Sequence, residues 1–269
     1  MIIAIFLILH WYSSLFFQSI FHHRYAAHGM FTMSRALEKI FYLGCFITQG
    51  SSYISANTYG IMHRLHHAHT DTEEDPHSPG NTANLFTMMW QTRNNYFNLY
   101  KERMMVEEKY KKDLPEWKSF EKIAHNFITR FLWIGTYLTF YIFFATEWWM
   151  FLFLPLTIVM GSLQGASVNW WAHRFGYVNF KQQNTSKNIL PVDFIFWGEA
   201  YHNNHHHHPG RPNNASKWFE VDIGFLAMKL MHKLRLIQLK STPQENIKPE
   251  FSAISRYRMQ MGRKYLQVK

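Results

Sequence analysis

Three short segments rich in histidine, far apart in this chain of 269 residues, constrain its fold more than any other feature. They read HHRYAAH, HRLHH and HNNHH, and their spaced histidines are His23 and His28, then His63, His66 and His67, then His202, His205 and His206. In the second and third segments the spacing is i, i+3 and i+4, which places the imidazoles on one face of a helix. Imidazole is the commonest metal-binding side chain. We therefore expect a fold that brings the three segments together around metal.

Two further residues, Asn169 and His173, are four apart and leave an apolar segment on the same helical face. With His173 the count is nine imidazoles, which is more than one tetrahedral zinc accepts and enough for two metals with four or five ligands each. Nitrogen ligands without thiolates point to iron, copper or zinc. Asp75 or His77 can orient a ligating imidazole through its free ring N–H, and Glu199 lies beside the third segment.

The other histidines and the cysteine receive structural interpretations. His10 lies inside an apolar segment and His125 stands alone, so neither is taken as a ligand. His207 and His208 lie off the face that the other three histidines share. The one cysteine, Cys45, cannot form an internal disulfide and is expected to be a small buried residue. A solvated acidic turn is expected at Asp71, Glu73 and Glu74.

Apolar and charged residues are segregated, although the mean hydropathy of −0.26 is that of a soluble protein. Segments 2–21, 127–146 and 149–170 are almost free of charge. Twenty helical residues cover roughly 30 Å, the thickness of a hydrocarbon core. We predict an all-α integral membrane protein with about three transmembrane helices, four being the alternative, and a helical cytoplasmic cap that holds the histidines. Lysine and arginine flank the hairpin 127–170 at its bases and not at its tip, which places the histidines on the cytoplasmic side.

The remaining segments receive coarser predictions. Segment 36–62 is expected to be an interfacial or re-entrant helix, because a crossing would separate the first two histidine segments. Residues 91–122 are expected to form surface helices. Residues 221–239 are expected to form an amphipathic helix that packs on the protein or lies on the membrane. Pro155 is expected to kink the last span.

We place one domain in residues 1–240 and a basic, polar tail in residues 241–269. The net charge of +10 is not accompanied by a nucleic-acid-binding motif, so we expect no nucleic-acid partner and assign the cations to the cytoplasmic face. A dimetal site at a membrane surface favours oxygen chemistry on a lipid, because oxygen and acyl chains both partition into the bilayer. The residues alone thus predict a polyhistidine dimetal oxidoreductase of the membrane.

The histidine segments resemble those of the membrane fatty acid desaturases, in particular the stearoyl-CoA (acyl-CoA) branch. That branch carries His-Arg-x-x-x-His, His-Arg-x-His-His and His-Asn-x-His-His, and HRYAAH, HRLHH and HNNHH match throughout. NWWAH, at the end of the last apolar segment, is similar to an Asn-x-x-x-His step of the family, and DPHSP and GEAYHNNHH are also similar. The resemblance covers residues 20–235, most of the chain.

The resemblance implies two iron ions held by the nine histidines, with Asn169 acting through a bound water, and O2 as co-substrate. It implies oxygen-dependent removal of two hydrogens from a saturated acyl chain to give a cis double bond, a step of unsaturated fatty acid biosynthesis. The branch favours acyl-CoA and the delta-9 position, while carrier protein and phospholipid stay open as acyl carriers. Electrons are expected from a separate protein, a ferredoxin or a cytochrome with its reductase, because the chain has no haem-binding pattern.

Two other functions stay open. A related diiron hydroxylase acting on alkyl chains or sterols shares the first hydrogen abstraction with a desaturase. A non-catalytic metal-binding or metal-transporting membrane protein predicts ligands along a conduit through the bilayer, whereas eight of the nine histidines lie outside the apolar segments. The better-known animal desaturases have four spans, and three are counted here.

Overall fold

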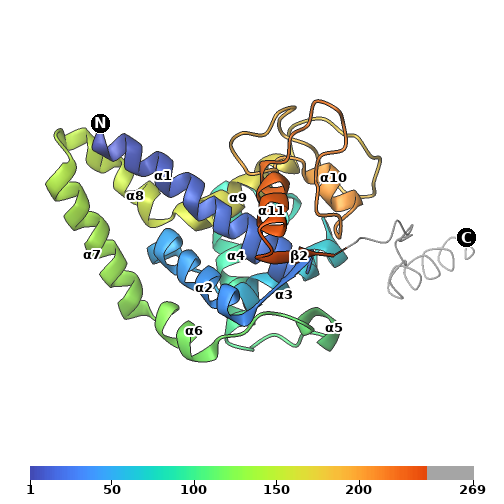
Figure 1. Cartoon of the computed structure of the whole chain (residues 1–269), viewed down its shortest axis with the longest axis horizontal. Coiled ribbons are helices and arrows are strands. Elements are labelled where there is room, and N and C mark those ends of the chain that lie inside the picture. Colours follow the sequence, from blue (N-terminus) through green and yellow to red (C-terminus); the bar gives the residue numbers. More distant parts are fainter. Residues whose placement is uncertain (241–269) are drawn as a thin grey trace, which may run out of the picture.

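Most of the described chain is helical. The computed structural model describes residues 1–240, so the predicted tail at 241–269 lies outside the described residues. The α-helices are α1 Ile2–Phe17, α2 Arg35–Gln49, α3 Ala56–His69, α4 Leu85–Tyr100, α5 Glu108–Lys111, α6 Lys118–Ala124, α7 Phe127–Phe144, α8 Leu154–Ile158, α9 Met160–Ala172, α10 His202–His207 and α11 Ile223–Lys233. The shorter elements are the π-helix η1 Gln18–Ala27, the 3-10 helices η2 Gly50–Ser52, η3 Pro79–Asn81 and η4 Trp148–Phe153, and the strands β1 Phe31–Met33 and β2 Ile237–Leu239. Figure 1 shows α1, α7 and α8 extending away from the body that contains α3, α10 and α11.

Two helices in the described chain are long and apolar enough to cross a membrane, and a bent pair makes a third if it is counted as one span. The first candidate runs from Ile2 to Ala27, because α1 continues into η1 without a break. The second is α7. Ile8 and Leu9 of α1 and Phe143 of α7 are largely exposed, as lipid-facing side chains of a membrane helix are. The described chain thus has two or three candidate spans, where about three were predicted.

The third predicted span is wrong as a single helix kinked at Pro155. The segment from Trp148 to Ile158 and α9 are bent by 71° with respect to each other. The break falls at Val159, whose φ of −106° and ψ of 15° leave the helical region. Pro155 instead lies in the first turn of α8, where proline is tolerated because its missing N–H would have no helical partner. The bend lets α9 pack against α1 and α4.

Segment 36–62 forms parts of two helices, α2 and α3, with a turn between them, and its interfacial or re-entrant placement stays a prediction. α2 starts behind the capping residue Ser34 and α3 starts behind Ser55, and neither helix is a candidate span. Between them Gly50 has a φ of +52°, which side chains rarely allow. A Cβ at Gly50 would also lie 1.9 Å from the hydroxyl oxygen of Tyr137 on α7. The turn therefore needs glycine on both counts.

The prediction of an all-α fold and of one helix over residues 221–239 needs correction. α11 ends at Lys233, and Arg235 takes a φ of +58°, which reverses the chain. β2 then pairs antiparallel with β1, with Phe31 opposite Leu239. The reversal buries Ile237 against the main apolar core, which explains why the chain leaves the helix there.

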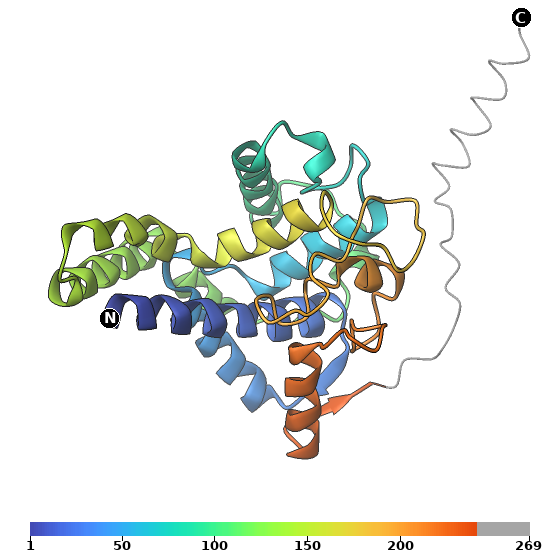
Figure 2. The ribbon, with the colours of Figure 1, turned by 90° about the horizontal axis from the view of Figure 1, so that it is seen from above.

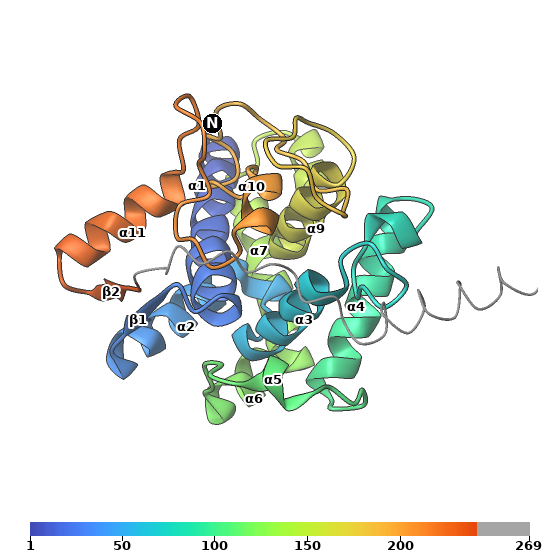
Figure 3. The same cartoon turned by 90° about the vertical axis from the view of Figure 1, so that its right-hand side faces the viewer.

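The structural interpretations of His125 and Cys45 are confirmed, and that of His10 is confirmed only in part. His125 stacks on Tyr100 with ring centroids 3.9 Å apart, and its Nε2 lies 2.9 Å from the hydroxyl of Tyr96. His10, expected to be a hydrogen-bonded structural histidine, is buried against aromatic rings of α1 and α7, but neither of its ring nitrogens has a hydrogen-bond partner within residues 1–240. Cys45 is fully buried. The predicted surface helices correspond to α4, α5 and α6, and Figure 3 shows α4 on the opposite side of α3 from α11.

Gly44 on α2 tests the packing of the first span. A Cβ there would lie 2.1 Å from Cζ of Phe17, so Gly44→Ala overpacks the contact at a cost of about 1–3 kcal/mol. Gly135→Ala is the matched control, because no atom lies within 4 Å of its Cβ position. We expect a lower midpoint of thermal unfolding, followed by tryptophan fluorescence in detergent, for Gly44→Ala alone. Equal midpoints for Gly44→Ala and the parent protein would contradict this packing.

Candidate metal centre

Five of the nine predicted histidines form one group, the five-histidine group: His23, His28, His63, His67 and His205. One ring nitrogen of each lies within 4.8 Å of the corresponding nitrogens of the others. The Nε2 atoms of His23 and His205 are 3.0 Å apart, and those of His67 and His205 are 2.9 Å apart. Nitrogen lone pairs this close repel unless a proton or a cation lies between them, so the arrangement fits a bound cation.

The other four histidines form the four-histidine group: His66, His173, His202 and His206. The Nε2 of His206 lies 3.0 Å from that of His202 and 3.2 Å from that of His66. The Nε2 atoms of His173 and His202 are 3.2 Å apart. All nine predicted histidines thus lie in one of two compact groups, and their role as metal ligands stays a prediction.

The helices α3 and α10 each contribute to both groups. His63 and His67, four apart on α3, enter the five-histidine group, and His66 enters the four-histidine group. On α10 the assignment is exchanged. His202 and His206, four apart, enter the four-histidine group, and His205 enters the five-histidine group. Residues four apart are closest in direction on a helix. The shared face expected for each histidine trio is therefore divided between two neighbouring centres.

The remaining ligand candidates come from the ends of two candidate membrane helices. The backbone N–H of His28 donates to the carbonyl of His23 at 3.1 Å, the i to i+5 bond of a π-helix. This wider turn brings residues five apart to the same side, which an α-helix would not do. His173 caps the C-terminus of α9, one turn after Asn169.

Carboxylates hold the outer nitrogens of two of these imidazoles. Oε2 of Glu199 lies 2.7 Å from Nδ1 of His23, and Oδ2 of Asp75 lies 2.9 Å from Nδ1 of His66. A proton on Nδ1 leaves the Nε2 lone pair directed into the group. Of the two alternatives for orienting an imidazole, Asp75 makes the contact. His77 donates its backbone N–H to Asp75, and its own buried Nε2 has no partner within residues 1–240.

Sequence reasoning missed the residues that hold His173. Its Nδ1 lies 3.0 Å from the Thr185 hydroxyl and 3.3 Å from Oδ1 of Asp71. The backbone N–H of Thr185 donates to Asp71 at 2.6 Å. The interpretation of Asp71 as part of a solvated turn is therefore wrong. Its contacts join positions more than a hundred residues apart, which no local pattern indicates.

Arg24 was also missed, although it follows His23 directly. Its guanidinium is completely buried, 2.9 Å from Oδ1 of Asp222 and 3.4 Å from Oε1 of Glu199. Nη1 also donates to the carbonyl of Pro212 at 2.8 Å. The arginine thus neutralises the carboxylate that orients His23, and it ties η1 to the C-terminal part of the described chain.

Burial sets the protonation of these groups. It lowers the pKa of the imidazoles of His28, His63, His66, His202, His205 and His206 well below the usual range, and that of His67 to about 3. Neutral imidazole is the form that binds metal. Burial alone would raise the pKa of Glu199, but its contact with His23 and the charge of Arg24 outweigh burial and lower that pKa to about 2. Burial raises the pKa of Asp75 to about 6.

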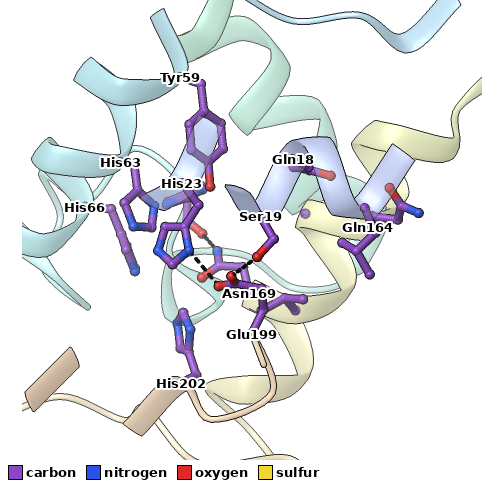
Figure 4. A pocket seen from close by; sticks show the side chains of 14 residues that line it. Gln18, Ser19, His23, Tyr59, His63, His66, Gln164, Asn169, Glu199 and His202 are labelled. Atoms are coloured by element: carbon purple, nitrogen blue, oxygen red, sulfur yellow. Dashed lines mark hydrogen bonds and ion pairs between the residues drawn. The ribbon is translucent and has the colours of Figure 1, made fainter. Parts of the chain in front are cut away.

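A cavity adjoins the histidines. Its lining includes His23, His63, His66, His77 and His202 together with Leu15, Gln18, Ser19, Tyr59, Gln164, Gly165, Val168, Asn169 and Glu199. Figure 4 shows Asn169 between the histidines and the Ser19–Glu199 contact. The Oδ1 of Asn169 is buried without a partner in the described part of the chain, while its Nδ2 donates to the carbonyl of His77. An orphaned acceptor beside nine imidazoles fits a water held by a metal.

The fold and the site together define a class, a mostly helical membrane protein with a polyhistidine centre that could hold two metal ions. The sequence model of the fatty acid desaturase family matches residues 1–216. The chain therefore belongs to the fatty acid desaturase family, as its histidine segments predicted.

Three relatives show the range of this family. An sn-1 stearoyl-lipid 9-desaturase of Synechocystis sp. is 27% identical, over 83% of this chain and 66% of that protein. A hex-5-enoyl-[acyl-carrier protein] acetylenase of Moorena producens is 29% identical, over 84% of this chain and 73% of the relative. An acyl-CoA 5-desaturase of Anemone leveillei is 26% identical, over 86% and 69% of the two chains. The chain therefore spans about two thirds of the length of these relatives.

Asp75→Asn tests whether the carboxylates support metal binding. The amide still accepts a hydrogen bond from His66, but it lacks the negative charge that strengthens this imidazole as a ligand. We expect affinity for one of two bound ions to fall about 10- to 100-fold. Titration of metal-free protein with Co²⁺, followed by its visible absorption, measures both sites.

The control is Glu74→Gln, an exposed carboxylate of the same loop that pairs with His69 outside both groups. It should bind Co²⁺ as the parent protein does. Equal Co²⁺ affinities for Asp75→Asn and Glu74→Gln would show that Asp75 does not support a metal.

Proposed function

We propose that this protein is an oxygen-dependent fatty acyl desaturase that introduces a cis double bond at a diiron centre. The observation that carries the proposal is the meeting of nine imidazoles in adjoining groups of five and four beside a cavity. The five-histidine group would hold one iron. The four-histidine group would hold the other, with Asn169 contributing through a water. An all-nitrogen, redox-capable centre of this kind suits oxygen activation, whereas zinc supplies no redox chemistry.

The overall reaction removes two hydrogens from adjacent methylenes. One O2, two electrons and two protons enter, and the two oxygen atoms leave as two waters, while a carbon–carbon double bond forms. The irons, when bound, supply the reductive activation of O2. The electrons would come from a separate protein, a ferredoxin or a cytochrome with its reductase.

The protein's own residues hold and orient the reacting parts. Glu199 and Asp75 keep protons on the outer nitrogens of His23 and His66, so that the inner nitrogens stay free for metal. Leu15 of the first span belongs to the cavity wall, where it offers apolar surface to acyl methylenes. The position of the double bond along the acyl chain would then depend on how deeply the acyl chain enters the cavity.

The proposal includes a membrane arrangement. Residues 1–240 would form the desaturase domain, with α1 and η1, α7, and the bent pair before His173 as spans of a multi-pass protein. The histidine groups would lie on the cytoplasmic side, since lysine and arginine flank the ends of the spans nearest to them. A basic surface on that side suits an acidic electron donor.

The proposal also names the molecule that carries the acyl chain. The three relatives are named for a lipid, a carrier protein and coenzyme A, so their names support acyl chains in general. We retain acyl-CoA and the delta-9 position from the likeness of the histidine segments to the acyl-CoA branch. The product of the experiment below gives the bond position.

Expression in a host that lacks the product tests the function. We expect a new monounsaturated fatty acid whose formation requires oxygen and iron. Gas chromatography with mass spectrometry detects it, and a derivative that fragments at the former double bond gives the bond position. His202→Ala should abolish it, because His202 belongs to the four-histidine group. A ferredoxin and its reductase, or a cytochrome with its reductase, are co-expressed to supply electrons.

His207→Ala is the matched control on the same helix. His207 stacks on Phe180 with ring centroids 4.2 Å apart and belongs to neither group, so product formation should persist. A hydroxy acid in place of the alkene would assign the chain to the diiron hydroxylases. Bound iron without lipid product, with both donor systems present, would favour the non-catalytic metal-binding reading.

A further inference from the structure

The helix α11 leaves a stripe of leucines uncovered. Leu226, Leu230 and Leu234, spaced by four, are 51%, 58% and 60% exposed. Residues four apart form one line along a helix, so the three side chains make a continuous apolar edge. The neighbouring α2 has a similar edge, formed by Ile40, Leu43 and Ile47, which are also exposed.

The opposite side of α11 packs against the rest of the protein, so the helix has one buried face and the three leucines belong to another. Met228 is completely buried. The backbone N–H of Gly224 donates to the carbonyl of Trp197 at 3.3 Å, and a Cβ at Gly224 would lie 2.6 Å from that oxygen. Asp222 caps the helix and pairs with the buried Arg24. One face of α11 is therefore packed against the protein, and the face with the three leucines is exposed.

Positive charge surrounds the leucine stripe. Residues 223–240 contain no aspartate or glutamate, and their exposed cations are Lys229, Lys233, Arg235 and Lys240. None of the ion pairs formed within residues 1–240 involves these four cations. A helix with leucines on one edge and lysines beside them has the composition of an interfacial helix that binds anionic lipids.

The position of α11 agrees with this composition. Its capping residue Asp222 binds Arg24, which lies in the last turn of the candidate span Ile2–Ala27. The end of a span is where hydrocarbon gives way to lipid headgroups. In Figure 2 the orange-red α11 runs across the direction of the blue α1, as a helix lying in the membrane surface would.

A second copy of the chain fits the stripe less well than a bilayer does. A symmetric contact would bring the same four cations against their equivalents without an acidic residue of this segment between them. Lipid phosphates supply the missing negative charge, and acyl chains accept leucines at a depth of about 5–10 Å.

We propose that α11 is an interfacial docking helix that inserts Leu226, Leu230 and Leu234 between acyl chains and holds anionic lipid phosphates with Lys229 and Lys233. Through Asp222 and Arg24 it fixes the depth of the histidine groups relative to the bilayer. This inference requires membrane association but no catalysis. The docking of α11 and the desaturase activity therefore have separate measurements, and the failure of one is distinguishable from the failure of the other.

Spin labels on the full protein in lipid nanodiscs test the insertion. Nitroxides are attached to Leu230→Cys, and to Glu107→Cys in a solvent-exposed loop as the control, with buried Cys45 left in place. We expect the label at 230 to be relaxed by oxygen and protected from a water-soluble nickel chelate, and the label at 107 to show the reverse. Strong relaxation by the nickel chelate at 230 would overturn the proposal, and so would shielding from both reagents, which indicates a protein partner.

The choice of lipid tests the charges. In discs that contain phosphatidylglycerol, the label at 230 should be protected more strongly than in phosphatidylcholine alone. Removing both lysines in Lys229→Gln/Lys233→Gln should cut this preference roughly tenfold or more, since each lysine near an anionic surface contributes roughly a fivefold effect. The control Lys109→Gln/Lys111→Gln removes two cations of α5 and should leave the preference intact. A label insensitive to the anionic lipid, or an equal loss in both double variants, would overturn the electrostatic contact.

Discussion

The buried ion pairs of Arg24 are the contact on which the rest of the structure depends. The guanidinium has no access to water and lies between Asp222 and Glu199, which follow it by 198 and 175 residues along the chain. Losing one partner of a buried pair typically costs about 3–5 kcal/mol, because the other charge is left uncompensated. The cluster therefore holds the end of the first candidate span against both the third histidine segment and α11.

The same cluster acts on the chemistry of the site. As a carboxylate, Glu199 accepts a stronger, charge-assisted hydrogen bond from Nδ1 of His23, and His23 together with the neighbouring arginine keeps the pKa of Glu199 at about 2 despite burial. The lone pair on the inner nitrogen of His23 then stays available for metal. One buried cation thus serves folding and ligand orientation together, which explains why an arginine directly follows His23 in the chain.

Local periodicity predicted much of the fold and the candidate ligands. The spacing of His63, His66 and His67 indicated one helix, and α3 covers all three. The apolar runs indicated the spans, because their composition is visible without tertiary contacts. What could not be predicted depends on distant partners. The contact of Asp71 with His173 and the pairing of β1 with β2 leave no periodic signal in the sequence. The break at Val159 follows from packing of α9, and no helix-breaking residue marks it.

The division of each histidine trio has a consequence for how the two centres are spaced. α3 and α10 both place a pair four residues apart in one group and the remaining histidine in the other, with the assignment exchanged between them. The distance between the two centres is therefore set by the rise and rotation within two rigid helices and depends little on loops. The π-helix and its C-cap add His23 and His28 to the five-histidine group, whereas the end of α9 adds only His173 to the four-histidine group. Asn169, whose Oδ1 has no partner among the described residues, belongs to the wall of the cavity, and that wall includes histidines of both groups.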